Sequence, residues 1–291
     1  MKKNLTPYIL LLPQIFLTAI LIASVVTCIF ESMGVIKIFG LEAPTLSYYK
    51  EILSKPSTVN GILYSLRISL ISSAIAVAIG VFLACIFLNN NNIAFSKLIQ
   101  LPIIIPHIAV TIFLINILSQ NGLLSRLAYW LGFLQEQQQF PTILYDKFGF
   151  GVIIGYLWKE IPFIIFIVIS IMSNINKKLG EAALNLGASK LKVFTKILIP
   201  LSKNTIISGF LIIFIFSLGA YELPALLGST TPKALPVLAY ESFLHPDLQN
   251  RPYAMALNGI IILISLICSI IYYLSMKNHL KQINDNQRGN L

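Results

Sequence analysis

Charged side chains are scarce in this chain, and their scarcity limits the folds it can adopt. Only 11% of the 291 residues are Asp, Glu, Lys or Arg, whereas 56% are hydrophobic. A soluble domain usually carries about 25% charged residues. The hydrophobic residues also form runs long enough to cross a bilayer core, which takes about 20 residues of helix. These features exclude a water-soluble core and predict an integral membrane protein.

Cysteine is also scarce, and its positions indicate no metal or redox chemistry. Cys28, Cys85 and Cys268 lie far apart in hydrophobic stretches, with no CxxC or Cys/His grouping. This pattern favours small hydrophobic residues over a disulfide or a metal site. Residues 25–28 weakly match a lipoprotein cleavage box. The hydrophobic run before them exceeds a signal-peptide core, which favours a retained first span.

Nucleotide-binding and catalytic motifs are missing as well. The sequence contains no GxxxxGK[ST], HExxH or GxSxG pattern and no acidic cluster of metal-ligand type. We therefore expect a protein that is not an enzyme, with no metal or cofactor of its own. If it drives active transport, the energy must come from a partner or an ion gradient.

The hydrophobic runs predict an all-α polytopic membrane protein with six transmembrane helices. Two of the runs are interrupted by residues that disfavour helix, namely Pro102 and Pro106 in the third, and Gly219 and Pro224 in the fifth. The predicted spans are Tyr8–Phe30, Ile62–Leu88, Leu98–Leu118, Gly149–Met172, Thr205–Leu227 and Tyr253–Met276.

The distribution of Lys and Arg predicts the orientation. With both termini in the cytoplasm, the inner segments carry the whole net charge of +10, and the outer segments are balanced. This asymmetry follows the positive-inside rule of plasma-membrane proteins. The basic balance is thus a topology signal, and no nucleic-acid partner is needed to explain it.

The third inner segment, residues 173–203, contains a pattern that predicts two short helices. Leu179, Ala183 and Leu186 form an apolar stripe at helical spacing. Gly187 can end the first helix, and Ser189 can cap a second one. Pro200 ends that second helix or starts the next span. Lysines surround the segment, so an amphipathic loop on anionic lipid is one interpretation.

The lipid interpretation leaves a spaced set of residues unexplained. Glu181, Ala182 and Ala183 are followed after three residues by Gly187, and nine residues later by Ile197 and Pro200. This pattern resembles the EAA motif of binding-protein-dependent ABC transporter permeases. Ile199 stands where that motif has Leu, and Asn176 stands near the place of a frequent Pro.

The resemblance implies a type I ABC importer permease fold and a division of labour between chains. It implies one transmembrane domain over residues 1–291, with a core at 60–276 and a cytoplasmic coupling loop at 173–203. That loop docks on one of two separate ATP-binding subunits, which hold and hydrolyse the ATP. A second permease, identical or homologous, and an extracytoplasmic solute-binding protein complete the importer. Its location is the bacterial plasma membrane, which is the inner membrane in bacteria that have two membranes.

Later stretches resemble the spermidine/putrescine branch of this family. They are Leu101–Pro106, Trp158–Phe163, Gly219–Pro224 and Lys233–Ala239. Polyamines are therefore the expected solute. Iron(III), thiamine and phosphonate permeases share much of these stretches and stay open as alternatives. An ion-coupled secondary transporter is an alternative of another class, but such folds often contain internal repeats, and no convincing repeat is found here.

Ionisable residues inside the spans are candidates for the substrate pathway, because charge is costly in a membrane. Glu160 and Glu222, with Trp158 and Tyr221, could line a path for a cationic solute, since acids attract ammonium groups and aromatic faces bind them. The alternative is that the acids form structural pairs with Arg67, Lys159 or the second permease.

Other polar and small residues in the spans have simpler explanations. Arg67 is expected to extend to the interface, and His107 to be an interior histidine with its hydrogen bonds satisfied. The stripe Ser72, Ala76, Gly80 and Ala84 predicts close helix packing. The segment Leu123–Leu134 is expected to lie at the outer interface.

Overall fold

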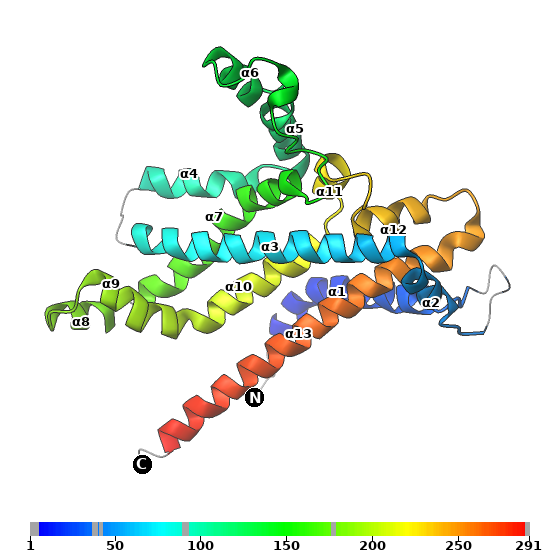
Figure 1. Cartoon of the computed structure of the whole chain (residues 1–291). Coiled ribbons are helices and arrows are strands. Elements are labelled where there is room, and N and C mark those ends of the chain that lie inside the picture. Colours follow the sequence, from blue (N-terminus) through cyan, green and yellow to red (C-terminus); the bar gives the residue numbers. More distant parts are fainter. Residues whose placement is uncertain (1–5, 37–39, 41–42, 89–92, 176–178, 289–291) are drawn as a thin grey trace.

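A computed structural model describes residues 6–36, 40, 43–88, 93–175 and 179–288. The regular elements in these residues are all helical (Figure 1). They are α1 Thr6–Ser32, α2 Ser47–Ser54, α3 Pro56–Phe87, α4 Ile93–Ile104, α5 His107–Leu118, α6 Leu123–Trp130, η2 Gln137–Gln139, α7 Phe150–Ile175, α8 Glu181–Asn185, α9 Lys190–Val193, η4 Phe194–Leu198, α10 Ile199–Gly219, α11 Glu222–Leu227, α12 Leu235–Phe243, η5 Leu248–Asn250 and α13 Arg251–Arg288.

Six helical stretches among the described residues are long and apolar enough to cross a membrane, which confirms the predicted number. They are Leu10–Ser32, Pro56–Phe87, His107–Trp130, Phe150–Ser173, Lys190–Gly219 and Leu248–Leu274. The prediction of an all-α polytopic fold is confirmed. The third and fifth spans differ most in form from the prediction, because each is broken close to a proline.

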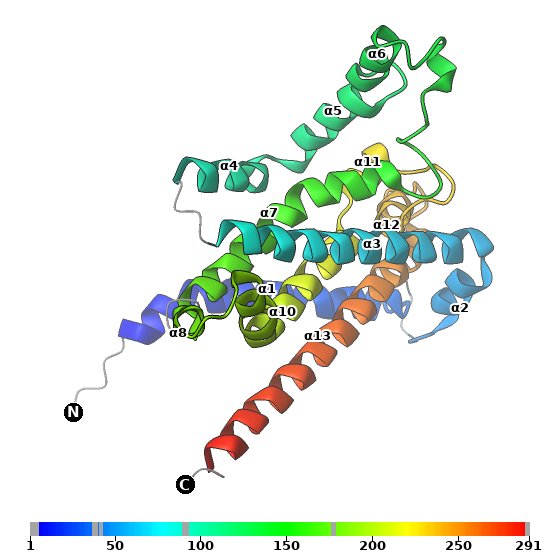
Figure 2. The same ribbon diagram turned by 60° about the vertical axis from the view of Figure 1, so that its left-hand side comes forward.

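The third span is not one helix from Leu98 to Leu118, as predicted. Helix α4 ends at Ile104, Pro106 adopts an extended conformation with ψ 148°, and α5 begins at His107. Proline disfavours helical geometry in the residue before it, so the chain turns at Ile105. Helix α4 lies along the body of the molecule, whereas α5 and α6 point away from it (Figures 1 and 2). Pro102, by contrast, lies inside α4.

The fifth span begins earlier and ends earlier than the predicted Thr205–Leu227. Helix α10 starts at Ile199 and stops at Gly219, where Ala220 becomes extended with ψ 132°. A separate short helix, α11, follows from Glu222. Because Pro224 has no N–H, a continuous helix could not form the hydrogen bond from residue 224 to the carbonyl of Ala220.

The centre of the molecule is the pair formed by α3 and α7, whose contact is the most extensive between any two elements. The predicted small-residue stripe on α3 makes this contact possible, because Ser72, Ala76, Gly80 and Ala84 are all buried. A Cβ added at Gly80 would lie 2.6 Å from Cγ2 of Ile164 on α7. The stripe therefore packs within the chain itself.

The two ends of α3 carry different structures. Helices α8 and α9 lie at the end of α3 near Phe87, and α2 and α12 lie at the opposite end (Figure 1). We call these the hairpin end and the far end. Helix α1 packs along α13 at the edge of the body. The core therefore joins the hairpin end to the far end through α3, α7 and α10.

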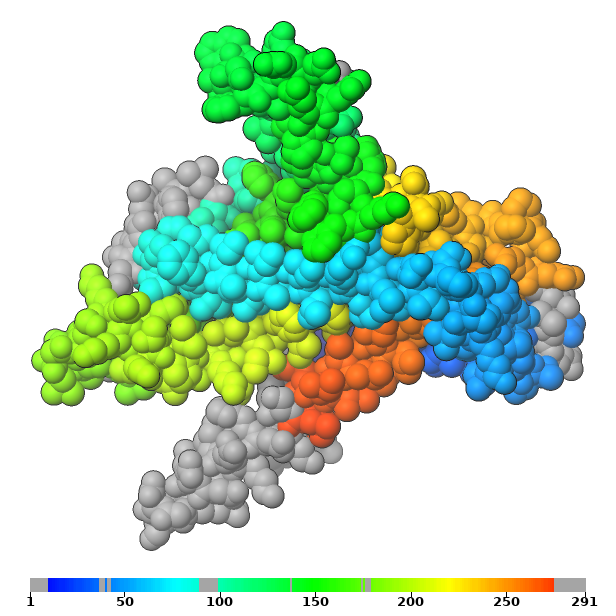
Figure 3. All heavy atoms as spheres, in the orientation of Figure 1, coloured from blue at the N-terminus to red at the C-terminus, as the bar shows by residue number. Residues whose placement is uncertain are grey.

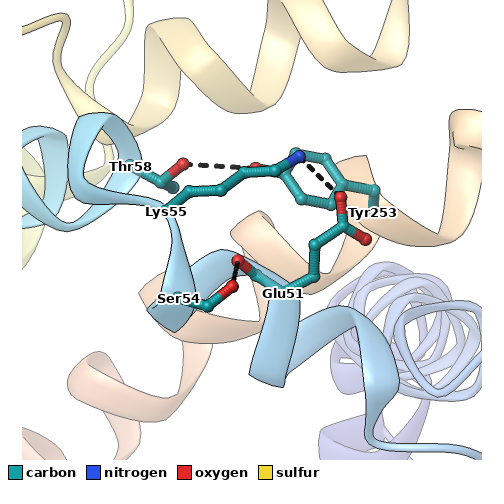
Figure 4. Close-up of polar contacts among 5 residues, drawn as sticks. All are labelled: Glu51, Ser54, Lys55, Thr58 and Tyr253. Carbon is teal, nitrogen blue, oxygen red and sulfur yellow. Dashed lines mark hydrogen bonds and ion pairs between the residues drawn. The ribbon is translucent and has the colours of Figure 1, made fainter.

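A small polar cluster joins α2, α3 and α13 at the far end (Figure 4). Lys55 Nζ donates a hydrogen bond to Glu51 Oε1 over 2.5 Å and lies 4.8 Å from the centre of the Tyr253 ring. The hydroxyls of Thr58 and Tyr253 are 3.2 Å apart. The hydrogen bond to Glu51 raises the pKa of the Lys55 amine above its ordinary value.

Candidate coupling hairpin and pathway residues

The tip of the hairpin is a tight turn built around Gly187. Helix α8 ends at Asn185, and Gly187 adopts a left-handed φ of 87°. The Ala188 N–H donates to the Ala183 carbonyl over 3.0 Å, and the Gly187 N–H donates to the Leu184 carbonyl over 2.9 Å. This is the Schellman arrangement, in which glycine is favoured at the left-handed position. Gly187 thus has the conformation that its place in the sequence predicts.

The second arm of the hairpin begins at Ser189 and continues without a break into the fifth span. The Ser189 side chain accepts a hydrogen bond from the Lys192 N–H, as an N-terminal cap does. A π-helical turn, η4, then connects α9 to α10. Pro200 lies in the first turn of α10, so it starts the span. The second arm of the hairpin is therefore continuous with α10.

The base of the hairpin is anchored in a core. Val193, Phe194 and Leu198 are buried in one cluster with Ala84 of α3 and Met172 of α7. Ala183 and Ile197 pack against the same cluster and are half-buried. This packing fixes the hairpin to three transmembrane helices.

The outward surface of the hairpin is polar at one edge and apolar at the tip. Glu181, Ala182, Gly187 and Pro200 are exposed. Leu186 is 89% exposed and Leu191 is 68% exposed. The predicted stripe of Leu179, Ala183 and Leu186 is therefore not one face, because α8 ends before Leu186 and the chain turns there. Leu186, which precedes Gly187, and Leu191 of α9 are the exposed leucines at the tip.

The exposure of these two leucines was not predicted from the sequence. Their periodicity is the same as that of buried residues, so the pattern alone assigns them to a packed stripe. The helix stop at Gly187 was the available signal, since a residue next to a turn can point away from the helix face that precedes it.

The structure separates the four predicted pathway residues into different surroundings. Glu160 is only 4% exposed, and its Oε1 accepts a hydrogen bond from the Ser217 hydroxyl on α10. Trp158 packs its ring against Phe113 of α5, with centroids 5.9 Å apart. Glu160 and Trp158 do not line the cavity that holds the other two residues.

Tyr221 and Glu222 share a cavity of 420 Å³ at the break between α10 and α11. His107, the first residue of α5, lines the same cavity, and its Nδ1 lies 3.8 Å from Glu222 Oε2. The ring of Tyr221 also packs against Tyr240 of α12, with centroids 4.7 Å apart. The cavity therefore lies where the break in the third span meets the break in the fifth.

Lys159 connects this cavity to the end of α4. Its Nζ donates a hydrogen bond to the Ile105 carbonyl over 2.8 Å and lies 3.5 Å from His107 Nδ1. Helix ends leave carbonyls without partners, and the lysine satisfies one of them. Lys159, His107 and Glu222 thus form a polar group at two helix breaks, where irregular backbone in a membrane must be buried or line a cavity.

The role of His107 at this group was not anticipated from the sequence. A histidine next to a proline in an apolar span is consistent with an ordinary interior residue, and nothing in the sequence places it beside Glu222. The cluster holds no metal-type grouping, and in the described part of the chain no three His, Cys, Asp or Glu residues lie together as metal ligands do.

Comparisons with known proteins agree with this architecture. Residues 76–281 match the family described as binding-protein-dependent transport system inner membrane component. The spermidine/putrescine transport system permease protein PotB of Salmonella typhimurium is 26% identical over 245 residues, which are 83% of this chain and 82% of PotB. The molybdenum transport system permease protein ModB of Haemophilus influenzae is 26% identical over 224 residues, covering 72% of this chain and 91% of ModB.

A solved structure has the same fold. A chain of the bacterial alginate ABC transporter, in complex with its periplasmic protein bound to an alginate pentasaccharide, superposes with a TM-score of 0.75 at 19% identity. The superposition covers 93% of both chains. The family match spans most of this chain, and the fold is that of a type I importer permease. The chain therefore belongs to the binding-protein-dependent transport system inner membrane components, the permease subunits of ABC importers.

Proposed function

We propose that this chain forms half of the translocation pathway of an ATP-driven importer, and that residues Glu181–Pro200 couple it to a separate ATPase. The observation that carries the proposal is the hairpin itself, which has an exposed tip on a buried base. A rigid base transmits force to α3, α7 and α10, whereas an exposed tip leaves Leu186 and Leu191 free to contact a partner.

The individual hairpin residues suit this docking role. Glu181 is exposed and could accept a charge-assisted hydrogen bond from a basic group of the ATPase. Ala182 has a side chain small enough to allow close approach, and Gly187 holds the turn. ATP stays on the partner subunits, and this chain supplies the mechanical link.

The orientation that we propose places the hairpin and both termini in the cytoplasm. Lysines 190, 192, 196 and 203 are all exposed around the hairpin. Basic residues near span ends remain on the cytoplasmic side. The far end, with α2 and α12, then faces outward, where an extracytoplasmic binding protein delivers the solute. The pathway is completed by a second permease, identical or homologous, and two ATP-binding subunits drive the importer.

The coupling role can be tested by reversing one charge at the hairpin. We expect Glu181→Lys to reduce copurification with the ATPase and to abolish uptake while the chain still inserts in the membrane. Lys203→Gln is a matched control, because it changes an exposed charge on α10 away from the tip. Uptake at the wild-type rate in the Glu181→Lys variant would contradict the proposal.

For the solute, we propose a polyamine of the spermidine/putrescine class. The polyamine permease PotB is among the relatives, and Glu222 and Tyr221 line an open cavity in the membrane region. Acids attract ammonium groups, and aromatic rings bind them. Glu160 contributes in this proposal from a buried position next to Ser217, with Trp158 on the α5 side of α7.

A second solute class is favoured by one observation, the position of Lys159. Its ammonium lies 3.5 Å from Nδ1 of His107, which lines the cavity together with Glu222. A cation there suits an oxyanion, and the molybdenum permease ModB is a relative of similar identity.

Two variants distinguish the polyamine class from the oxyanion class. The polyamine proposal predicts that Glu160→Gln/Glu222→Gln loses spermidine uptake. If that double variant transports spermidine normally while Lys159→Met loses molybdate uptake, the oxyanion assignment replaces it.

A further inference from the structure

The far end of the molecule, where α3 begins, contains a pocket of 760 Å³ that is separate from the coupling hairpin and from the cavity at Glu222. It lies between the first part of α3, the loop before α7 and the segment that leads into α12. Its charged lining residues are Arg67, Lys147, Lys233 and Glu241. Lys233 donates to both carboxylate oxygens of Glu241, at 2.7 and 2.8 Å, so this pair is neutral. The remaining two charges are both positive.

Arg67 is held in place before any ligand binds. Its guanidinium lies 4.8 Å from the ring centre of Phe148 and 5.5 Å from that of Tyr64. One of its Nη atoms donates to the Lys147 carbonyl over 2.5 Å. In the part of the chain that the structure describes, no carboxylate forms an ion pair with Arg67 or Lys147. A guanidinium fixed in this way loses little side-chain entropy when it binds an oxyanion.

The loop that carries Lys147 is also rigid. The Asp146 carboxylate accepts hydrogen bonds from the N–H groups of Phe148, Gly149 and Phe150 at the start of α7. This carboxylate is therefore occupied at the helix N-terminus, where a negative charge is stabilising. Gly149, with φ 94°, packs so closely on α3 that an added Cβ would lie 2.6 Å from Ile68 Cγ2. The Asp146 carboxylate, next to Lys147 in the chain, is thus committed to backbone contacts.

The depth of the pocket matches the level of lipid phosphates. Arg67 is the one charged residue of α3, and the 20 positions from Ile68 to Phe87 carry no charge. At about 1.5 Å per residue, such a run spans about 30 Å, which is the thickness of a bilayer core. If Phe87 marks one boundary of the core, Arg67 lies at the other.

An uncovered apolar surface leads from the pocket into the membrane. Leu63, Leu70, Phe82 and Ile86 are exposed on α3. By helical spacing, Leu63 and Leu70 lie on the same face as Arg67, and Phe82 and Ile86 lie further around the helix towards its other end. Phe82 is 64% exposed. Figure 3 shows α3 uncovered along one side of the molecule. A group with a charged head and long apolar chains fits both the pocket and this surface.

We propose that the pocket binds the phosphate headgroup of an anionic phospholipid, with its acyl chains along the exposed face of α3. Arg67 and Lys147 hold the phosphate by charge-assisted hydrogen bonds. Ser57, Asn60 and Thr230, which also line the pocket, provide hydrogen bonds for a polar headgroup such as glycerol. A volume of 760 Å³ is far larger than a bare phosphate needs. In the orientation proposed above, the lipid belongs to the outer leaflet.

The test measures binding of phosphatidylglycerol to the purified full-length chain in neutral detergent, with phosphatidylcholine of the same acyl chains as the comparison. We expect Arg67→Gln/Lys147→Gln to weaken phosphatidylglycerol binding about tenfold. Lys50→Gln/Arg126→Gln removes two positive charges that lie outside the pocket, on α2 and α6, and should leave the affinity unchanged. Equal binding of the two lipids by the wild-type chain, or equal weakening by the control, would overturn the proposal.

Three further arms keep the result decisive. Inorganic phosphate and glycerol phosphate should bind far more weakly than the lipid, and binding as tight as that of phosphatidylglycerol would replace the lipid with a free anion. If the double variant does not fold, Lys147→Gln alone, whose side chain is exposed, should still weaken binding by a few-fold. Unchanged affinity in that variant overturns the assignment. Loss of the lipid when the chain assembles with a second permease would show that a protein covers this face instead.

Discussion

At the scale of single residues, the backbone of Gly187 determines the shape of the hairpin tip. A left-handed φ costs an ordinary residue about 1–2 kcal/mol, and more for a β-branched one, whereas asparagine tolerates it. Nothing lies within 4 Å of a Cβ added at Gly187, so a larger side chain there meets no steric obstacle. Substitution at this position thus tests conformation alone.

We therefore expect Gly187→Val to abolish ATP-dependent uptake in proteoliposomes, with normal insertion and expression. Gly187→Asn is the matched variant and should retain most of the uptake, because it can keep the turn. The measurement is the uptake rate of both variants with the same ATPase subunits. Equal rates for Val and Asn would show that the left-handed turn is not needed.

The pair of Glu51 and Lys55 predicts a small pH dependence of stability at the far end. The pKa of Lys55 is raised in the folded chain by its hydrogen bond to Glu51. The stabilisation is therefore complete below the unfolded pKa of about 10.4 and is lost as the pH rises through the higher folded value. Both side chains are about half exposed, so solvent screening limits the effect to a few tenths of a kcal/mol.

The measurement is the difference in apparent Tm between the wild-type chain and Glu51→Gln at pH 8 and at pH 11.5. We expect a small deficit for the variant at pH 8 that shrinks at the higher pH. A deficit that persists or grows at the higher pH would mean that Glu51 stabilises the far end in some other way than by accepting from the charged lysine.

At the scale of helices, the contact between α3 and α7 depends on small residues. Gly80→Leu would place side-chain atoms where Ile164 already lies, and overpacking of this kind costs about 1–3 kcal/mol. Ala78→Leu is the matched control, since Ala78 lies on the exposed face of the same helix. We expect the first variant to lower the Tm of the purified chain by several degrees and the second to leave it nearly unchanged. Similar Tm values for both would contradict the assigned packing.

Periodicity and proline positions predicted the helices but not how they are joined. Pro106, Gly219 and Pro224 marked the weak points in the third and fifth spans. Pro106 has a larger effect than predicted, because the helix ends before it. In sequence, a proline that only bends a supported helix looks the same as one that ends a helix. The direction of α5 after the break depends on contacts with α7 and α11, which are distant in sequence.

The candidate site, too, was predictable in part: its local features could be predicted from the sequence, and its long-range contacts could not. The hairpin was predictable because its signals are local, namely a glycine stop, a serine cap and a proline at the start of α10. The meeting of His107, Lys159 and Glu222 was not predictable, because three separate elements contribute the residues. Glu160 and Glu222 seemed equivalent in sequence, yet one is buried against Ser217 and the other faces a cavity.

At the scale of the whole molecule, the architecture places two surfaces at opposite ends of a continuous core. The hairpin lies at one end of α3, and the pocket lined by Arg67 and Lys147 lies towards the other end. Charge counting along the sequence distinguished these ends, because basic residues gather at the hairpin. It could not reveal that Arg67 and Lys147 come together, since they approach only through the packing of the loop before α7 on α3.

The proposed coupling requires that the tip of the hairpin contacts an ATPase from the cytoplasm, and cysteine cross-linking at Leu186 tests this contact most directly. The chain for this test carries Leu186→Cys, with Cys28, Cys85 and Cys268 replaced by alanine, and is assembled with its ATPase subunits in inverted membrane vesicles. We predict a cross-link from residue 186 to the ATPase, and labelling of the same cysteine by an impermeant maleimide in these vesicles when the ATPase is absent. Labelling from the outside of intact cells, or the absence of any cross-link in an assembled, transporting complex, would contradict the account.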